Sequence, residues 1–313
     1  MLQRADSVCC ERKRMSLSGQ VAIITGGSAG IGRAIAARLA QEGASLMLAA
    51  RSASRLEEAA AELRAAGATV QTVAADVSDP GDLTQLVDAT LSEFGQIDVL
   101  VNNAGIDCYH HFHTLEMEDI LGTIETNLTG TILLTRLVIP HMLERSSGHI
   151  INVASTAGKH CPGFASVYGA TKAGQIAFTQ GLRGEYGDRG ISASAICPGF
   201  TRSGGIYDRM VQATGKTTSS LLGSTTTDAV AAAVVKAIRT GAPELIVNWP
   251  PVRPAMVIKE IFPRLGEKLA MMASRKFARR VADAHEADAH DADAQQANAP
   301  ELKNPAEQPS DGQ

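Results

Sequence analysis

The strongest constraint on the fold is a regular alternation between short aliphatic runs and longer amphipathic stretches. The runs predict strands at Val21–Thr25, Ser45–Ala50, Val70–Ala75, Val99–Asn102, His149–Ala154, Ser192–Ile196 and Leu245–Asn248. Helical periodicity between them predicts helices over Ile31–Gln41, Arg55–Ala66, Pro80–Glu93, Glu118–Glu144, Val167–Asp188 and Asp228–Arg239. Several runs are apolar throughout, which is typical of strands covered on both faces. The pattern therefore predicts an α/β fold of the Rossmann type, a doubly wound seven-stranded parallel sheet with helices on both faces.

Charge divides the chain into four parts. The net charge of −4 argues against a nucleic-acid binder, and the five scattered cysteines argue against a disulfide scaffold. That total conceals a segment of +6 over residues 253–280 and one of −7 over residues 282–313. We expect a flexible leader at 1–17, the α/β domain at 18–252, a basic amphipathic helical extension at 253–281 and a disordered acidic tail at 282–313.

In terms of targeting, the sequence shows neither a signal peptide nor a membrane span. No apolar run is long enough for a signal peptide or a membrane span, so we expect a cytoplasmic protein. Met15 precedes the first strand closely and is a candidate natural start, which makes Cys9 and Cys10 leader residues. A lipidated or metal-binding cysteine pair is the alternative interpretation. His285 and His290 could bind a metal, but we expect no metal site.

A glycine-rich turn follows the first strand and opens the first helix. It reads Thr25-Gly26-Gly27-Ser28-Ala29-Gly30-Ile31-Gly32. Glycines let the backbone approach a pyrophosphate, and the amides at a helix N-terminus favour negative charge. At the end of the second strand, where NAD-binding chains usually carry an acid, this chain has Arg51. Because Arg51 can pair with a 2′-phosphate, we predict NADP(H) over NAD(H).

Further motifs appear in a fixed order: Asp76-Val77, Asn102-Asn103-Ala104-Gly105, Asn127, Ser155, Tyr168-Gly-Ala-Thr-Lys172 and Pro198-Gly199. Together with Thr25–Gly32 they make residues 18–250 resemble the short-chain dehydrogenase/reductase family. The resemblance implies a catalytic set of Asn127, Ser155, Tyr168 and Lys172. Tyr168 would exchange a proton with the substrate oxygen, Ser155 would hydrogen-bond the carbonyl, and Asn127 would hold a water linked to Lys172. An ammonium four residues from the phenol on one helix face favours the phenolate, which would lower the pKa of Tyr168.

The resemblance also implies a cofactor set. Lys172 and Tyr168 would face the nicotinamide ribose, and Asp76 and Val77 the adenine. Asn103, Ala104 and Gly105 would line the cofactor channel, and Pro198 and Gly199 would flank the nicotinamide. Many relatives carry Thr where this chain has Ser203, whose hydroxyl is expected to keep the carboxamide contact, with Thr201 as a less favoured substitute.

The implied activity is interconversion of a carbonyl and an alcohol on a hydrophobic long-chain, steroid-like or retinoid-like substrate. Residues 200–227 are expected to close over that substrate. The run Asp107–His113 could line the same pocket or be exposed at the surface, and a metal site at its three histidines is the less favoured alternative. Reduction of 3-oxoacyl thioesters is the alternative within enzymes, and a non-catalytic cofactor-sensing scaffold is the alternative outside them.

Small residues form a stripe at Ala170, Ala173, Ala177, Gly181 and Gly184. Such a stripe lets a second helix approach closely, or it packs against the chain's own sheet. The family resemblance implies that this helix and the preceding long one form a two-fold interface, so we expect a homodimer or tetramer. The extension over Met256–Arg280 has an apolar face and a basic remainder, with Pro263 kinking or dividing it. Two interpretations of the extension stay open. It lies on an anionic membrane, at the inner face, or it docks over the active-site mouth or a dimer partner.

Overall fold

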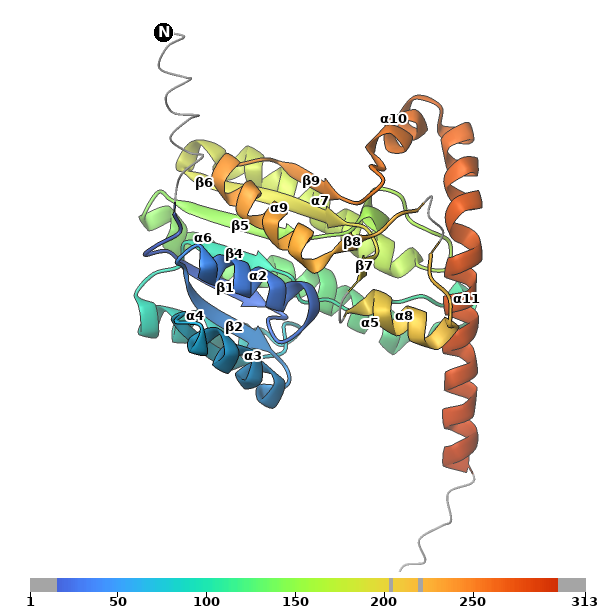
Figure 1. The fold of residues 1–313 in the computed structure, drawn as a ribbon, viewed down its shortest axis with the longest axis horizontal. Coiled ribbons are helices and arrows are strands. Elements are labelled where there is room, and N and C mark those ends of the chain that lie inside the picture. The colour runs from blue at the N-terminus through green and yellow to red at the C-terminus, as the bar shows by residue number, and fades with distance from the viewer. Residues whose placement is uncertain (1–15, 203–204, 219–221, 298–313) are drawn as a thin grey trace, which may run out of the picture.

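The computed structural model describes residues 16–202, 205–218 and 222–297. Its centre is a seven-stranded, fully parallel sheet in the order β3-β2-β1-β4-β5-β6-β9, which confirms the predicted fold class (Figure 1). The strands are β1 (Val21–Thr25), β2 (Ser45–Ala50), β3 (Val70–Ala74), β4 (Val99–Asn102), β5 (Gly148–Val153), β6 (Ile191–Pro198) and β9 (Glu244–Val247). The strand order reverses between β1 and β4, so the crevice for a ligand opens beyond the carboxyl ends of these two strands.

Helices cover both faces of the sheet because successive residues of each strand point to opposite sides. Ile24 and Val101 face a core with α2 (Gly30–Gln41), α3 (Ala53–Ala65) and α9 (Thr227–Thr240). Ile23 and Leu100 face a second core with α4 (Pro80–Phe94), α6 (Gly130–Glu144) and α7 (Ser166–Tyr186). Shorter elements complete the body: η1 (Phe112–Thr114), η3 (Thr156–Gly158), η4 (Gly187–Arg189), β7 (Thr201–Arg202), α8 (Ile206–Thr214) and β8 (Thr225–Thr226).

The helix expected over Glu118–Glu144 is interrupted. It consists of α5 (Met117–Ile124), a π-helical turn η2 (Glu125–Thr129) and α6. A π turn inserts one extra residue per turn and is common at functional sites, but it has no sequence period from which it could be predicted. Asn127 lies in this turn and is fully buried.

The C-terminal extension folds as two helices. Pro263 divides them into α10 (Arg253–Ile261) and α11 (Pro263–Ala297), as one of the two expected effects of this proline. The disorder expected from residue 282 is wrong for the described part of the tail, because α11 continues to Ala297 and buries Val281 and Ala282. Alanine-rich sequence has high helix propensity, and packing against the body supplies the burial that composition alone did not reveal.

The structure also moves the expected boundary between the leader and the α/β domain. Leu17, expected in the leader, is buried, and its amide donates to the Glu42 carbonyl. The expectations for Met15, Cys9 and Cys10, and for residues 298–313, lie outside the described residues. In the part that the structure describes, no helix has both the length and the apolar character needed to cross a membrane.

Candidate active site

The glycine turn forms an open cradle at the start of α2. Gly26 has φ +67°, and a side chain at Gly32 would collide with the carbonyl oxygen of Gly26. The residue before the helix, Ala29, has no side chain that could cap the first amides. These amides therefore remain available to an anionic group, as a pyrophosphate site requires.

Hydrogen bonds join the ends of β1 and β4 beneath this cradle. The Thr25 Oγ1 accepts from the amides of Asn103 and Ala104, each at 3.0 Å. The Asn103 Nδ2 donates to the Thr25 carbonyl at 2.9 Å. The polar residues after the two strands thus fix the walls of the crevice, where the sequence placed a cofactor channel.

Arg51 lies directly after β2 and is exposed. Its Nη1 is 3.9 Å from the Asp76 Oδ2, a loose surface pair of small energetic value. The Asp76 Oδ1 accepts from the amide and hydroxyl of Ser78 at 2.9 and 2.6 Å. Burial acts to raise the pKa of Asp76, but these hydrogen bonds and the Arg51 charge leave it lowered. Val77 is buried next to Asp76, and its carbonyl lies against Gly130 at the start of α6.

Ser155, Tyr168 and Lys172 meet beyond the carboxyl end of β5. Ser155 caps η3, and its Oγ accepts from the Ala157 amide at 3.1 Å. Tyr168 and Lys172 lie on α7, and the Lys172 Nζ is 5.8 Å from the centre of the Tyr168 ring. The Lys172 Nζ donates to the Val153 carbonyl and to the Gln175 Oε1, both at 3.0 Å.

Burial dominates the protonation of these two groups. It raises the pKa of Tyr168 to about 12, against an opposing hydrogen bond from Ser155. It lowers the pKa of Lys172 to about 8. The expectation of a lowered pKa for the phenol is therefore wrong for this chain, because desolvation by burial is the largest influence and it raises the pKa. At neutral pH, Tyr168 is a protonated donor.

Asn127 belongs to the same cluster through its neighbours. Its Oδ1 accepts from the Ile106 amide at 2.8 Å, and its Nδ2 donates to the Ile106 carbonyl at 2.9 Å. A Cβ on Gly105 would lie 3.0 Å from the Asn127 Oδ1 and 3.5 Å from the Lys172 Nζ, so only glycine fits comfortably between them. The Gln175 Nε2 donates to the Asn127 carbonyl at 2.7 Å. The sequence reading missed Gln175, although its spacing of three from Lys172 on one helix was a usable signal.

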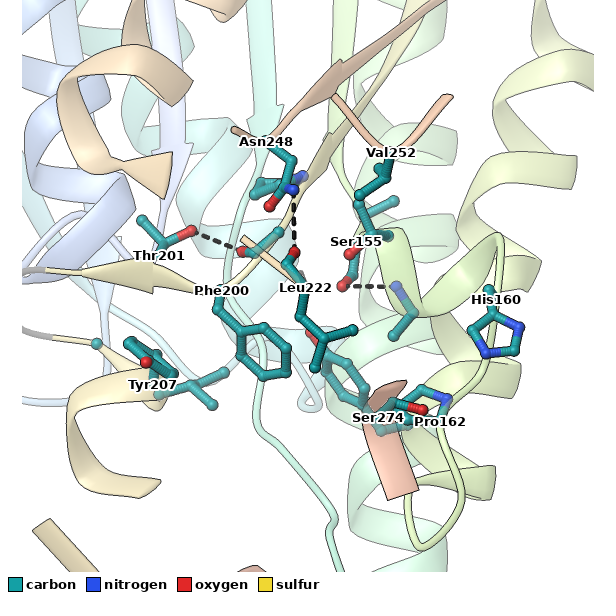
Figure 2. Close-up of a pocket in the computed structure, with 18 of the residues that line it drawn as sticks. Ser155, His160, Pro162, Phe200, Thr201, Tyr207, Leu222, Asn248, Val252 and Ser274 are labelled. Carbon is teal, nitrogen blue, oxygen red and sulfur yellow. Dashed lines mark hydrogen bonds between the residues drawn. The ribbon is translucent and has the colours of Figure 1, made fainter. Parts of the chain in front are cut away.

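One cavity of about 490 Å³ joins the cradle to Ser155 and Tyr168. Gly26, Gly30, Ile31, Gly32, Asn103, Ala104, Gly105, Pro198, Gly199 and Thr201 line its cofactor side, while Thr25, Ser28, Arg51, Asp76, Val77, Asn127 and Lys172 are not among its lining residues. Thr201 lies across the cavity from Ser155, and its Oγ1 donates to the Gly199 carbonyl at 3.0 Å (Figure 2). Ser203 is outside the described residues.

The substrate side of the cavity is mostly apolar. Tyr109, Phe200, Tyr207, Met210 and Leu222 line it, as expected for the segments that contain them. Figure 2 shows Phe200 and Leu222 between Thr201 and Ser155. The sequence reading missed His160 and Pro162, which follow η3, and Asn248, which follows β9. The Nε2 of His160 is buried with no hydrogen-bond partner among the described residues.

Helix α11 closes one side of this cavity. Phe277, Ala278 and Val281 are buried against Tyr109, Tyr207 and Met210. The Phe277 ring stands edge-on to Phe200, with the ring centres 5.4 Å apart. Polar contacts continue along the helix, from Asp283 to His111 at 2.9 Å and from Glu286 to Thr114 at 2.7 Å. Of the two interpretations of the extension, docking over the active-site mouth therefore describes this part of α11.

The histidines near the cavity lie in hydrogen bonds and ring contacts. The Nδ1 of His285 donates to the Tyr109 carbonyl at 3.0 Å, and the His285 ring is 5.0 Å from that of His110. Within the described residues, no group of three or more His, Cys, Asp or Glu side chains has an arrangement that could hold a metal ion.

Comparison with known proteins identifies the architecture. The family model of the short chain dehydrogenases matches residues 20–211. The chain belongs to the short-chain dehydrogenase family. A ketoacyl reductase, HetN, of Nostoc sp. is 40% identical over 238 residues, which are 76% of this chain and 81% of that protein.

Solved structures of short-chain dehydrogenases share the fold. A variant of the actinorhodin polyketide ketoreductase, solved with NADPH, has a TM-score of 0.68 at 32% identity and covers 75% of this chain and 97% of its own. A metagenomic short-chain oxidoreductase with NADP has a TM-score of 0.63 at 31% identity, covering 74% and 98%. Another neighbour, a xylitol dehydrogenase, is bound to NAD+, with a TM-score of 0.68 at 26% identity, covering 75% and 99%.

Proposed function

We propose that this short-chain dehydrogenase reduces a ketone or aldehyde group of an apolar substrate with NADPH. One observation carries the proposal. A single cavity connects an uncapped helix N-terminus and glycine cradle to Ser155 and Tyr168, and continues into an apolar chamber. Such an arrangement places an anion site, a proton donor and a substrate pocket in one connected cavity.

The residues present fit a nicotinamide dinucleotide. A Cβ at Gly32 would fill the space beside the Gly26 carbonyl, and the amides of α2 are free to bind a pyrophosphate. Gly26, Gly30, Ile31 and Gly32 would hold the phosphates, with Ser28 in the same turn. Asp76 and Val77 would contact the adenine, and Asn103, Ala104, Gly105, Pro198 and Gly199 the rest of the molecule. When bound, the cofactor supplies the hydride.

Tyr168 and Ser155 act on the substrate oxygen. The Ser155 hydroxyl donates a hydrogen bond to the carbonyl and stabilises the charge that develops there. Tyr168, protonated because burial raises its pKa to about 12, gives its proton to that oxygen. Lys172 is held beneath Tyr168 by the Val153 carbonyl and Gln175. In this proposal Asn127 positions Lys172 across Gly105 and holds the water that the family resemblance implies.

NADP(H) is the preferred cofactor. Arg51 stands at the end of β2 with only a loose contact to Asp76, so its guanidinium is available to a 2′-phosphate. The structural neighbours bound to NADPH and NADP support the same preference.

The decisive test is an NADPH-oxidation screen over ketones graded by chain length and ring size. Turnover is expected to rise with the apolar size of the ketone. Tyr168→Phe should abolish turnover and leave NADPH affinity unchanged, because the phenol hydroxyl gives the proton and does not hold the phosphates. Undiminished turnover by Tyr168→Phe would disprove the assigned role.

Reduction of a 3-oxoacyl thioester is a second candidate. The ketoacyl reductase name of the Nostoc relative favours it. Acyl-carrier-protein and CoA thioesters, assayed beside free ketones of equal chain length, separate the two candidates. A preference for the thioesters would assign the second function.

We also propose that the protein forms a homodimer. The small residues Ala170, Ala173, Ala177, Gly181 and Gly184 are all exposed on α7, so the stripe does not pack against the chain's own sheet. Leu121 on α5 and Ile132 on α6 are exposed as well. A sedimentation experiment in which Ala177→Arg converts a dimer to a monomer would support this interface, and an unchanged mass would reject it.

A peripheral contact with an anionic membrane at the inner face is part of the same proposal for a cytoplasmic enzyme. Apolar side chains remain exposed on α10 and on the first turns of α11, among basic residues. Amphipathic helices of this kind bind anionic lipid surfaces through both components.

A further inference from the structure

The outer side of α10 and α11 carries an apolar strip that nothing in the described structure covers. Its residues are Val257, Ile261, Leu265 and Met272 on the helices, Phe262 between them and Trp249 just before α10. Trp249 is 76% exposed, and Ile261 and Phe262 are 64% and 60% exposed. Single exposed apolar residues are ordinary, but six of them within or just before one pair of helices indicate an interaction surface.

The charged residues of the two helices indicate what kind of partner the strip binds. The same two helices carry Arg253, Lys259, Arg264, Lys268, Arg275 and Lys276, against Glu260 and Glu267, and all of these basic residues except Lys259 are exposed. Within the described residues, no ion pair joins these six basic side chains to an acid. Exposed apolar side chains on helices that also carry unpaired cations complement an anionic lipid surface.

The remainder of α11 fixes the direction of approach. Acidic residues follow from Asp283 onward, and this end of the helix runs past the body, away from α10 (Figure 1). An anionic surface repels the acidic end and attracts the basic end. The molecule would therefore rest on lipid with the α10–α11 corner.

The same corner is a wall of the active-site cavity. Ala255, Met256, Ala270 and Ser274 line the cavity from the inner side of the two helices. Gly266 lets the helices approach closely, because its Cα faces the Lys259 backbone without a side chain between them. The inner side of this hairpin is thus a pocket wall, and its outer side is the apolar strip.

Two further apolar residues of these helices are exposed and line the cavity. They are Ile258 and Leu269, which are 44% and 54% exposed. We propose that an apolar path leads from the strip past Ile258 and Leu269 into the chamber that contains Tyr168, and that this path is a portal through which a lipid-dissolved carbonyl compound passes from an anionic bilayer directly into the active site. The proposal rests on the reductase function above and names its substrate class.

Trp249 provides a direct reporter, because it is the only tryptophan of the chain. The probes are phosphatidylcholine vesicles with and without phosphatidylserine, each carrying brominated acyl chains that quench tryptophan. Quenching is expected with the anionic vesicles, and it should weaken as salt is raised.

Turnover then tests the portal. A long-chain ketone dissolved in the anionic vesicles is compared with a short, water-soluble ketone, for the wild type and for Ile261→Glu/Phe262→Glu. Neither replaced residue lines the cavity. The variant should lose roughly tenfold or more of the rate on the vesicle-borne ketone, because burial of these side chains contributes much of the docking. Its rate on the short ketone should equal that of the wild type, which also verifies its folding.

A matched control adds the same two charges elsewhere. Ala61→Glu/Gln85→Glu places them on exposed positions of α3 and α4, on the opposite side of the molecule from α10 (Figure 1). This variant should behave as the wild type with both ketones. A general charge effect would instead slow both variants alike and overturn the proposal.

The remaining outcomes are distinct. Equal rates of wild type and Ile261→Glu/Phe262→Glu on the vesicle-borne ketone overturn the portal but leave the reductase function intact. A change of oligomeric mass in this variant assigns the strip to a second copy of the chain and also overturns the portal. Absence of turnover by the wild type on both ketones rejects the reductase function itself, and the portal with it.

Discussion

Phe277 should hold α11 against the body, and its removal should release the helix without unfolding the domain. The ring is 5% exposed, packs edge-on against Phe200 at 5.4 Å and lies 6.3 Å from the Tyr207 ring. Replacing a buried Phe by Ala costs about 3–5 kcal/mol. The polar contacts of Asp283 and Glu286 contribute only about 0.5–1.5 kcal/mol each. Phe277→Ala therefore removes at least as much stabilisation as the roughly 1–3 kcal/mol that these two contacts supply together.

Hydrogen exchange resolves the effect along the chain. Amides of α11 and α8 should lose roughly 100-fold protection or more, since each 1.4 kcal/mol is about a factor of ten. Amides of β4 and β5 should keep the protection of the wild type. Phe262→Ala is the matched control, because this ring belongs to the same extension but is exposed, so its removal should change stability by less than about 0.5 kcal/mol. Equal loss of protection in the sheet and in α11, or none in α11, would refute the reasoning.

Three further predictions concern the cofactor cradle and the buried lysine. Arg51→Ala should raise the Kd for NADPH roughly 10- to 100-fold, because it removes a charge-assisted hydrogen bond to the 2′-phosphate. The Kd for NADH should stay unchanged, since NADH has no such phosphate. Fluorescence titration measures both, and an equal loss for the two cofactors would contradict the assignment. Gly32→Ala should abolish NADPH binding in the same titration, because its methyl group collides with the Gly26 carbonyl; retained affinity would show that the turn is not the phosphate site. Burial lowers the pKa of Lys172 from 10.5 to about 8, so its charged form destabilises the fold and the free energy of unfolding should rise between pH about 8 and 10.5. Lys172→Met should lack this rise in urea titrations, and a pH-independent difference between the two proteins would exclude the linkage.

The sequence by itself determined the sheet, because its signals are local. Apolar strand runs and amphipathic helices have fixed periods, and each strand of the predicted set is found in the sheet. The turn Thr25–Gly32 and the pair Tyr168 and Lys172 could also be located, since neighbours along one turn or one helix face must lie together. The family resemblance added Ser155 and Asn127, which are far from them in the chain.

Only the tertiary structure decided what depends on burial and on contacts between distant segments. The pKa of Tyr168 is raised and not lowered, because desolvation by burial outweighs the hydrogen bond from Ser155. The π turn at Asn127 arises from packing and has no sequence period of its own. Composition predicted disorder from residue 282, yet Ala282 is buried, Val281 packs in a cluster with Tyr109, and Asp283 contacts His111, which lies 172 residues earlier in the chain. Local patterns specify which segments form helices and strands, whereas the free energy that orders α11 comes from surface it buries on other elements, which no local pattern contains.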